Sequence, residues 1–368
     1  MQSGQKTAIY LGAGILVAII GISLGLSALE ENVPASPASD YTAEVQNIDK
    51  SRFKQAPQLV GIADYINTTP EELQSQIDGK VVLYDIWTYS CINCIRTLPH
   101  ITAWDAKYAD DGLLIIGVHS PEFEFEKDVN NVNMAVEKNG INYPVVLDND
   151  KETWKAFENR YWPRKYIADH EGYIRYDHIG EGAYEETEKV IQRLLKERAD
   201  SMGMQIEPTQ LVELDEFEHS GFRTPELYLG YKFAQGRNQL GNDEGFRPEN
   251  EVVYSLPENR DLHYFYLDGT WKNLEDGMKL ISESGSITLQ YRAKQVNIVA
   301  GGSANLEIFL DGEPVSSRHM GDHLTPDSRL LVQEHDLYNI ISSSDSGTHD
   351  LTIKVDDPGF ELFTFTFG

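Results

Sequence analysis

Cys91 and Cys94 are the only cysteines in the 368 residues, and they form a single Cys-x-x-Cys pair. An apolar run at 81–87 precedes them and is typical of a buried strand, whereas 92–108 has the pattern of a helix. Cys91 therefore lies at a helix N-terminus, where backbone amides stabilise a thiolate and lower its pKa. Cys94 is three residues further on, within disulfide reach on the same helix face. We predict that Cys91 attacks and Cys94 resolves.

The same spacing has two other interpretations. The two thiols could be inert core cysteines, or they could supply half of a zinc site. The sequence holds no second Cys-x-x-Cys, so zinc would have to recruit distant histidines or carboxylates. Redox chemistry is therefore favoured, with no metal and no other cofactor.

Asp85 lies six residues before Cys91 inside the apolar segment VVLYDIW. An ionised carboxylate is costly in such a strand unless it is functional or well paired. Buried near the resolving thiol, Asp85 could take and return the proton of Cys94. The alternative is a strand-end aspartate turned to solvent, which period-two alternation also allows.

Pro163 follows Trp162 and precedes the strand-like segment KYIAD. A cis Trp162–Pro163 bond would lay a backbone edge against the disulfide and offer a short strand for substrate pairing. Most X-Pro bonds are trans, so this assignment depends on the family resemblance described below.

The elements that must hold these residues follow from periodicity. Apolar runs alternate with amphipathic ones between residues 57 and 200, which predicts an α/β domain. Strands are expected at 81–87, 113–118, 144–147, 165–169 and 173–178, and helices at 92–108, 126–139, 152–158 and 184–200. The acidic run FEFEKD within this domain is interpreted as a solvated face.

After residue 204 the pattern changes to short strands of period two, which predicts an all-β, jelly-roll-like sandwich over 205–368. Asp311-Gly312 is a hairpin signal, and FTFTF at 363–367 would place three phenylalanines on one face. Trp271, Tyr264 and Tyr266 could stack on sugars in a carbohydrate-binding module. The favoured interpretation is that they fill the sandwich core.

The N-terminal region predicts export. Residues 7–29 carry no charge and are long enough to cross a bilayer as one helix. The run lacks a clean small-x-small cleavage site, so an uncleaved anchor is favoured over a signal peptide. Lys6 then keeps 1–6 cytoplasmic, and 30–56, rich in Pro, Ser and Ala, forms a linker to domains outside the cytoplasm.

The net charge of the chain excludes some classes of binding partner. Lys+Arg is 31 against Asp+Glu 59, a formal net charge of −28, which excludes nucleic acid and anionic membrane surfaces as main partners.

The motifs together resemble one family. WTYSCINCIRTLPH, GVHSPEFEFE, YPVVLDND, YWPRKYIADHEGYIR and GEGAYEETE are similar to the TlpA-type thioredoxin domain of DipZ proteins, and TPELYLGY, YRAKQVNIV and FTFTFG to the sandwich that follows it. The resemblance covers 57–368. It implies a thioredoxin fold over 57–204, with Asp85 as the buried acid and Cys91 and Cys94 as the redox pair. Pro163 would be the cis-proline, flanked by Trp162, and Trp87 the aromatic beside the active site. These three residues are expected to dock the substrate.

Three features depart from that family. Ser90 stands where thioredoxins usually carry tryptophan, and Ile92-Asn93 replaces Gly-Pro between the cysteines, so the reduction potential does not carry over. Full-length DipZ proteins also begin with a multi-helix electron-importing domain, whereas this chain offers one helix.

The expected function is therefore an extracytoplasmic thiol-disulfide oxidoreductase that reduces disulfides of exported proteins, in cytochrome c biogenesis or related thiol homeostasis. It would be recharged by a separate membrane thiol carrier. Alternatives are a disulfide oxidase or isomerase, and a surface protein in which the sandwich binds a glycan or a protein. A peroxidase is rejected. Thr88 lies three residues before Cys91, as in the Thr-x-x-Cys motif of peroxiredoxins, but Tyr84 occupies the position four residues before Thr88 where that motif has proline.

Overall fold

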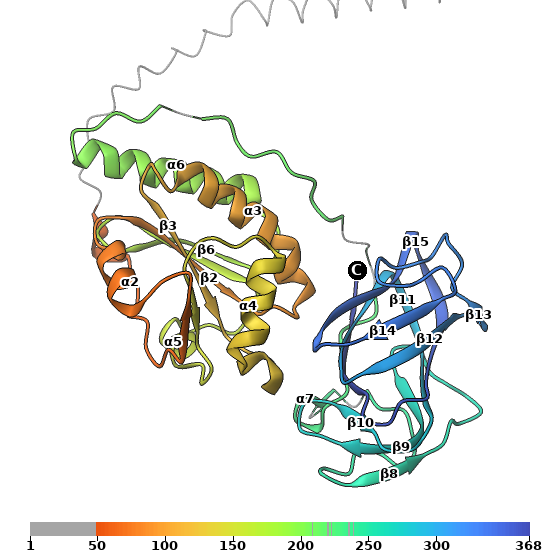
Figure 1. Cartoon of the computed structure of the whole chain (residues 1–368). Coiled ribbons are helices and arrows are strands. Elements are labelled where there is room, and N and C mark those ends of the chain that lie inside the picture. Colours follow the sequence, from red (N-terminus) through yellow and green to blue (C-terminus); the bar gives the residue numbers. More distant parts are fainter. Residues whose placement is uncertain (1–48, 208, 219–220, 222, 235, 238) are drawn as a thin grey trace, which may run out of the picture. The chain divides into compact units, whose positions relative to one another are not determined.

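A computed structural model describes residues 49–368, except 208, 219–220, 222, 235 and 238 (Figure 1). The predicted cytoplasmic segment 1–6, the anchor 7–29 and most of the linker lie outside the described residues. Within the described part of the chain, no helix is both long and apolar enough to cross a bilayer. Lys50–Gly368 form one compact unit.

The first domain is built on a six-stranded mixed sheet in the order β1-β4-β3-β2-β5-β6. Strands β2, β3 and β6 of this sheet are labelled in Figure 1. Strand β2 pairs in parallel with β3 and antiparallel with β5. All seven residues of β2 are buried because the strand lies inside the sheet, which explains its continuous apolar run. The strands are β1 (Asp64–Ile66), β2 (Val81–Trp87), β3 (Leu113–His119), β4 (Val145–Leu147), β5 (Arg164–Ala168) and β6 (Ile174–Ile179).

Helices cover this sheet, and separate apolar clusters pack on its two faces. The predicted α/β pattern is confirmed, and β2 and α3 have the predicted bounds. The segment expected as one helix at 126–139 divides, because Asp128 accepts from the Asn130 amide at 2.9 Å and caps a new helix. The helices are η1 (Lys50–Arg52), α2 (Pro70–Ile77), α3 (Ile92–Tyr108), η2 (Glu124–Lys127), α4 (Val129–Lys138), α5 (Glu152–Ala156) and α6 (Tyr184–Ser201).

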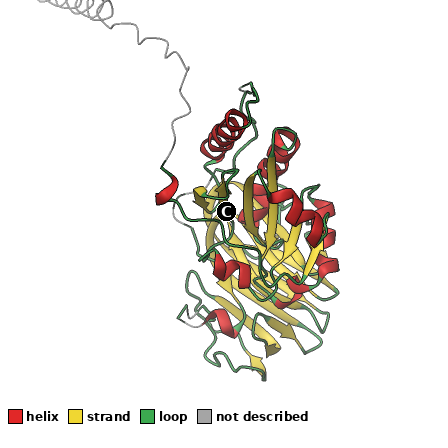
Figure 2. Cartoon of the chain, turned by 90° about the vertical axis from the view of Figure 1, so that its left-hand side faces the viewer, coloured by secondary structure: helices red, strands yellow, loops and turns green. Residues whose placement is uncertain are grey.

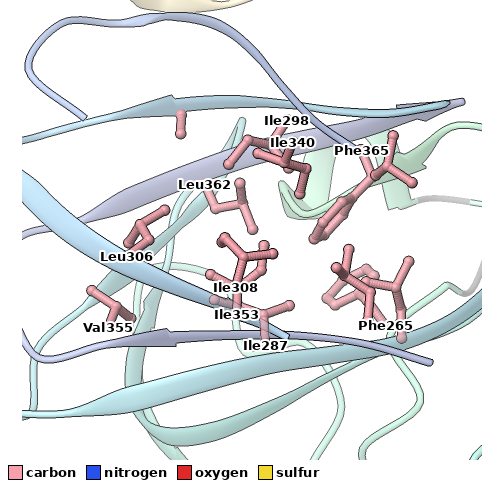
Figure 3. Packing of buried hydrophobic residues seen from close by; sticks show 14 of the residues in the cluster. Phe265, Ile287, Ile298, Leu306, Ile308, Ile340, Ile353, Val355, Leu362 and Phe365 are labelled. Atoms are coloured by element: carbon pink, nitrogen blue, oxygen red, sulfur yellow. The ribbon is translucent and has the colours of Figure 1, made fainter. Parts of the chain in front are cut away.

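The second domain is almost entirely β, as predicted (Figure 2). Its sheet runs β13-β12-β15-β11-β16-β10-β9-β8. In addition, β14 pairs with β12 and β7 pairs with β16. Buried side chains from these strands point toward one another in one core (Figure 3). The elements are β7 (Leu227–Tyr228), α7 (Tyr231–Ala234), β8 (Glu251–Tyr254), β9 (Phe265–Asn273), β10 (Met278–Leu280), β11 (Gly285–Gly301), β12 (Ala304–Leu310), β13 (Glu313–Pro314), β14 (Arg329–Val332), β15 (Asp336–Val355) and β16 (Glu361–Phe367).

The predicted Asp311-Gly312 hairpin is confirmed. Strands β12 and β13 flank these two residues, whose φ angles are 54° and 84°. Two successive positive φ angles are what a two-residue type I′ turn requires.

The aromatic residues proposed as sugar-stacking positions do not form a surface. Trp271 is 0% exposed and Tyr266 is 3% exposed, and only Tyr264 is half-buried. Trp271 packs edge-on against Phe360 in the sandwich core. The glycan-stacking hypothesis for Trp271 and Tyr266 is therefore wrong, because a sugar needs an accessible ring face.

The FTFTF segment also differs from its prediction. The register of β16 against β11 shifts between Leu362 and Thr364, which makes Phe363 the extra residue of a β-bulge. Phe365 and Phe367 stay in the sandwich core, whereas Phe363 belongs to a different cluster. The bulge thus divides three phenylalanines that strict alternation would keep on one face.

Both flanks of the first domain are held to it. Residues 50–56, assigned to the linker from sequence, contact the domain: Lys50 pairs with Asp169 at 3.0 Å, and Ala56 N–H donates to the Gly172 carbonyl at 2.8 Å. After α6, the Val212 amide donates to Glu188 at 2.8 Å. Compact structure therefore begins before residue 57.

Candidate active site

The two cysteines lie where β2 gives way to α3. Cys91 is the N-cap residue of α3, in an extended conformation, and its carbonyl accepts from the Ile95 amide at 3.0 Å. Cys91 is half-buried, whereas Cys94, one helical turn on, is 1% exposed. Burial raises the pKa of the Cys94 thiol well above its ordinary value, and a hydrogen bond with Cys91 adds to this. One thiol is thus open to a substrate and the other is sheltered as a protonated group.

Asp85 lies beneath the pair in β2 and is 1% exposed. Burial raises its pKa to about 6, and the positive charge of Lys165 partly opposes this effect. Its negative charge in turn helps to raise the pKa of Cys94. Its Oδ1 atom has no hydrogen-bond partner among the described residues. Asp85 is therefore a buried carboxyl group with a vacant acceptor atom that titrates near neutral pH.

Lys165 is a site residue that the sequence analysis missed. It lies directly opposite Asp85 in the β2–β5 pairing and is 0% exposed. Burial lowers the pKa of its ammonium group to about 8, while Asp85 and Cys94 act in the opposite direction. A buried cation next to a carboxylate and a thiol favours the ionised form of each. Only strand pairing, which the sequence alone does not give, brings these groups together.

We expect Asp85→Asn to slow the resolving step roughly 100-fold at pH 7, because the amide cannot accept the Cys94 proton. In the native chain the carboxylate form increases as pH rises through about 6. The rate of mixed-disulfide resolution should therefore rise across that pH and lose the inflection in the variant. Rapid-quench alkylation between pH 5 and 8 measures it.

Asp177→Asn is the matched control, since Asp177 forms a surface ion pair with Arg164 at 2.6 Å. It should leave both the rate and the inflection unchanged. An unaltered pH profile in Asp85→Asn would remove Asp85 from the mechanism.

The Trp162–Pro163 peptide bond is cis, as predicted. Pro163 directly precedes β5, and its carbonyl accepts from the Gly180 amide at 2.8 Å. The Trp162 indole donates to the Ser120 carbonyl at 2.9 Å, and its ring packs on Trp154 with 4.3 Å between centroids. Trp162 as a whole residue is half-buried.

Trp87 does not fit the docking role predicted for it. It is 0% exposed and belongs to the core beneath the site. Its ring meets His119 edge-on at 5.3 Å, and a Cβ at Gly117 would come within 3.0 Å of its indole nitrogen. Trp87 therefore packs in the core beneath the active-site loop and offers no exposed ring face on which a substrate could dock.

Glu126 is a second residue that sequence reasoning missed, because FEFEKD is typical of a solvated face. Its side chain is 0% exposed. It accepts from the Ser90 hydroxyl at 2.6 Å and the Phe123 amide at 2.9 Å. Burial raises the pKa of Glu126, and these hydrogen bonds act against the rise. The carboxyl group thereby fixes Ser90, the residue immediately before Cys91.

The loop around Cys91 also contacts the sandwich. The Tyr89 hydroxyl donates to the His335 carbonyl at 3.1 Å. Ile92 and Ile95 pack on a buried group that we call the interface cluster, and it takes members from both domains. Its buried residues are Phe123, Tyr228, Val299, Leu337 and Phe363. One flank of the α3 N-terminus is therefore covered by the second domain.

A Cys-x-x-Cys pair at the start of α3, a buried acid in β2 and a cis-proline before β5 define a thioredoxin-like redox protein. Family models agree with this assignment. Residues 54–195 match Redoxin, and residues 224–368 match the thioredoxin-like C-terminal domain.

Comparison with known proteins gives the family. Protein DipZ of Mycobacterium bovis is 32% identical over 350 residues, covering 94% of this chain and 47% of that protein. Thiol-disulfide oxidoreductase YkuV of Bacillus subtilis is 31% identical over 143 residues, covering 38% of this chain and 94% of YkuV. A solution structure of a thioredoxin-like protein in the oxidized form is 30% identical, with a TM-score of 0.36 and coverage of 39% and 97%.

The chain belongs to the thioredoxin-like family that includes the thiol-disulfide oxidoreductase YkuV, and over most of its length it is also similar to DipZ. It spans about half the length of the DipZ proteins that it matches.

Proposed function

We propose that the chain reduces disulfide bonds in exported proteins, with Cys91 as the nucleophile and Cys94 as the resolving thiol. The observation that carries this proposal is the asymmetry of the pair: Cys91 is half-buried at the surface, and Cys94 is buried beside Asp85. Pro163 and Trp162 are proposed to dock the substrate chain, since both lie immediately before β5.

The proposed reaction is an exchange between the two thiols of Cys91 and Cys94 and one disulfide bond of the substrate. The Cys91 thiolate attacks one sulfur of the substrate disulfide, forms a mixed disulfide and releases the other substrate sulfur as a thiolate. Asp85 then takes the proton of Cys94, whose sulfur attacks Cys91 and releases the second substrate thiolate. Two substrate thiols and a Cys91–Cys94 disulfide result, so two electrons pass to the substrate.

The proposed location is outside the cytoplasm, on a membrane anchor. The charge-free stretch 7–29 and the linker that follows support this placement. Glutathione and cytosolic thioredoxin do not reach that compartment. A separate membrane thiol carrier would therefore have to return two electrons to the Cys91–Cys94 disulfide after each turnover.

An oxidase or isomerase is the second candidate, because Ile92-Asn93 between the cysteines leaves the potential open. Alkylation of the two thiols in intact cells, scored by mass, separates the directions. A mostly reduced pair that becomes oxidised when membrane thiol carriers are deleted is the expected result. A pair that is mostly disulfide-bonded and insensitive to such deletions would defeat the reductase.

A further inference from the structure

A cavity of about 470 Å³ opens beside the active-site loop, where the two domains meet. Tyr89, Ile92 and Ile95 contribute to one wall, and Asn297 and Leu337 of the sandwich contribute to another. Tyr89 and Ile92 flank Cys91 at two residues before it and one after it. The volume falls within the range of roughly 300–1,000 Å³ that is usual for ligand sites. A chain bonded to the Cys91 sulfur would therefore have this cavity next to it.

Asn297 gives the cavity a specific chemical feature. The Asp322 amide donates to Asn339 Oδ1 at 3.0 Å, so the other atom of that side-chain amide must be nitrogen. Asn339 Nδ2 in turn donates to Asn297 Oδ1 at 2.8 Å. Asn297 Nδ2 is left buried, with no partner among the described residues. A buried donor without an acceptor is costly, and a ligand carbonyl would satisfy it.

The lining favours a polypeptide over a sugar. Ile92, Ile95 and Leu337 supply an apolar surface for a side chain, and Asn297 supplies the donor for a backbone carbonyl. A sugar usually needs an open aromatic face. In this cavity Arg96 covers the Phe217 ring at 3.4 Å, and the Tyr89 ring stacks on His119 at 5.8 Å.

We infer that this cavity binds an extended segment of the substrate polypeptide next to its disulfide. An apolar side chain of the segment packs on Ile92 and Ile95, and one of its carbonyl groups accepts from Asn297 Nδ2. The inference rests on the proposed function and adds to it. The sandwich is then a recognition element for longer substrates. A disulfide too small to extend from Cys91 into the cavity reacts without contacting the sandwich.

The test uses the whole chain, pre-reduced, in single-turnover reactions with two oxidants. One is a synthetic peptide with an intramolecular disulfide flanked by leucines, and the other is bis(2-hydroxyethyl) disulfide. Met134→Trp narrows the cavity from its rim, since Met134 lines it and is 41% exposed. Met202→Trp is the matched control, because Met202 is 46% exposed and lies after α6, away from the cavity.

Met134→Trp and Asn297→Ala should each lower the second-order rate with the peptide about tenfold, while the rate with the small disulfide changes less than twofold. Met202→Trp should change neither rate. Thermal melting of each variant checks that the sandwich remains folded. Because Met134 lies outside the sandwich core, its variant keeps the test valid even if Asn297→Ala unfolds the domain.

Unchanged peptide rates in the Met134 variant, or equal losses with both oxidants, would overturn the inference. Competitive inhibition of the peptide reaction by a neutral oligosaccharide would assign the cavity to a sugar instead. Failure of the native chain to reduce either oxidant would contradict the proposed function itself, and so the two failures are distinguishable.

Discussion

Cys91→Ser should abolish disulfide reduction, leaving only the rate of the uncatalysed reaction, whereas Cys94→Ser should accumulate a stable mixed disulfide through Cys91. Cys91 is the accessible thiol of the pair, and Cys94 is 1% exposed with a pKa well above its ordinary value. Nucleophilic attack requires a thiolate that can reach the substrate. Without Cys94, the intermediate has no internal thiol to release it.

Mass spectrometry of each variant after incubation with a disulfide-bonded protein measures the outcome. The double variant Cys91→Ser/Cys94→Ser gives the background. Trapping by Cys91→Ser would reverse the assigned roles, and full activity in either single variant would exclude a two-thiol mechanism.

Trp271→Ala should lower the free energy of unfolding of the sandwich by roughly 3–5 kcal/mol, the usual cost of removing a large buried aromatic side chain. The Trp271 side chain is 0% exposed, and its indole donates to the Asp268 carbonyl at 2.9 Å. Truncation would leave both a cavity and a free carbonyl acceptor. Urea unfolding followed by circular dichroism measures the change.

Val253→Ala is the surface control in the neighbouring strand β8, because Val253 is 72% exposed and should cost no more than about 0.5 kcal/mol. Native-like stability of Trp271→Ala with loss of glycan binding would reinstate the sugar-stacking hypothesis and refute the core assignment.

Much of the first domain could be predicted from local patterns. The continuous apolar run of β2 and the helix that follows Cys91 have strong periodicity, and both bounds agree with the structure. Asp85 stood out because a charge interrupts an apolar run. These signals lie in neighbouring residues, where sequence reasoning is strongest.

The remainder of the site depends on distant pairing. In the sequence, Lys165 has the features of an ordinary strand residue. Only the pairing of β5 with β2 places it opposite Asp85. Glu126 looks solvated in the sequence because charged residues adjoin it, yet its carboxylate accepts from the Ser90 hydroxyl, which lies 36 residues away along the chain. The bulge at Phe363 adds no unusual residue type, and so alternation alone could not reveal it.

The interface cluster has a consequence for the order in which the active site is completed. Chains are synthesised from the N-terminus, and domains generally fold as units in that order. Cys91 and Cys94 therefore emerge well before Leu337 and Phe363, which help to cover the flank of α3. During that interval Tyr89 also lacks its acceptor on His335. Under the proposed roles, the nascent first domain would present Cys91 before the second domain completes the wall of the cavity, and selectivity for partners would be acquired only when the second domain folds.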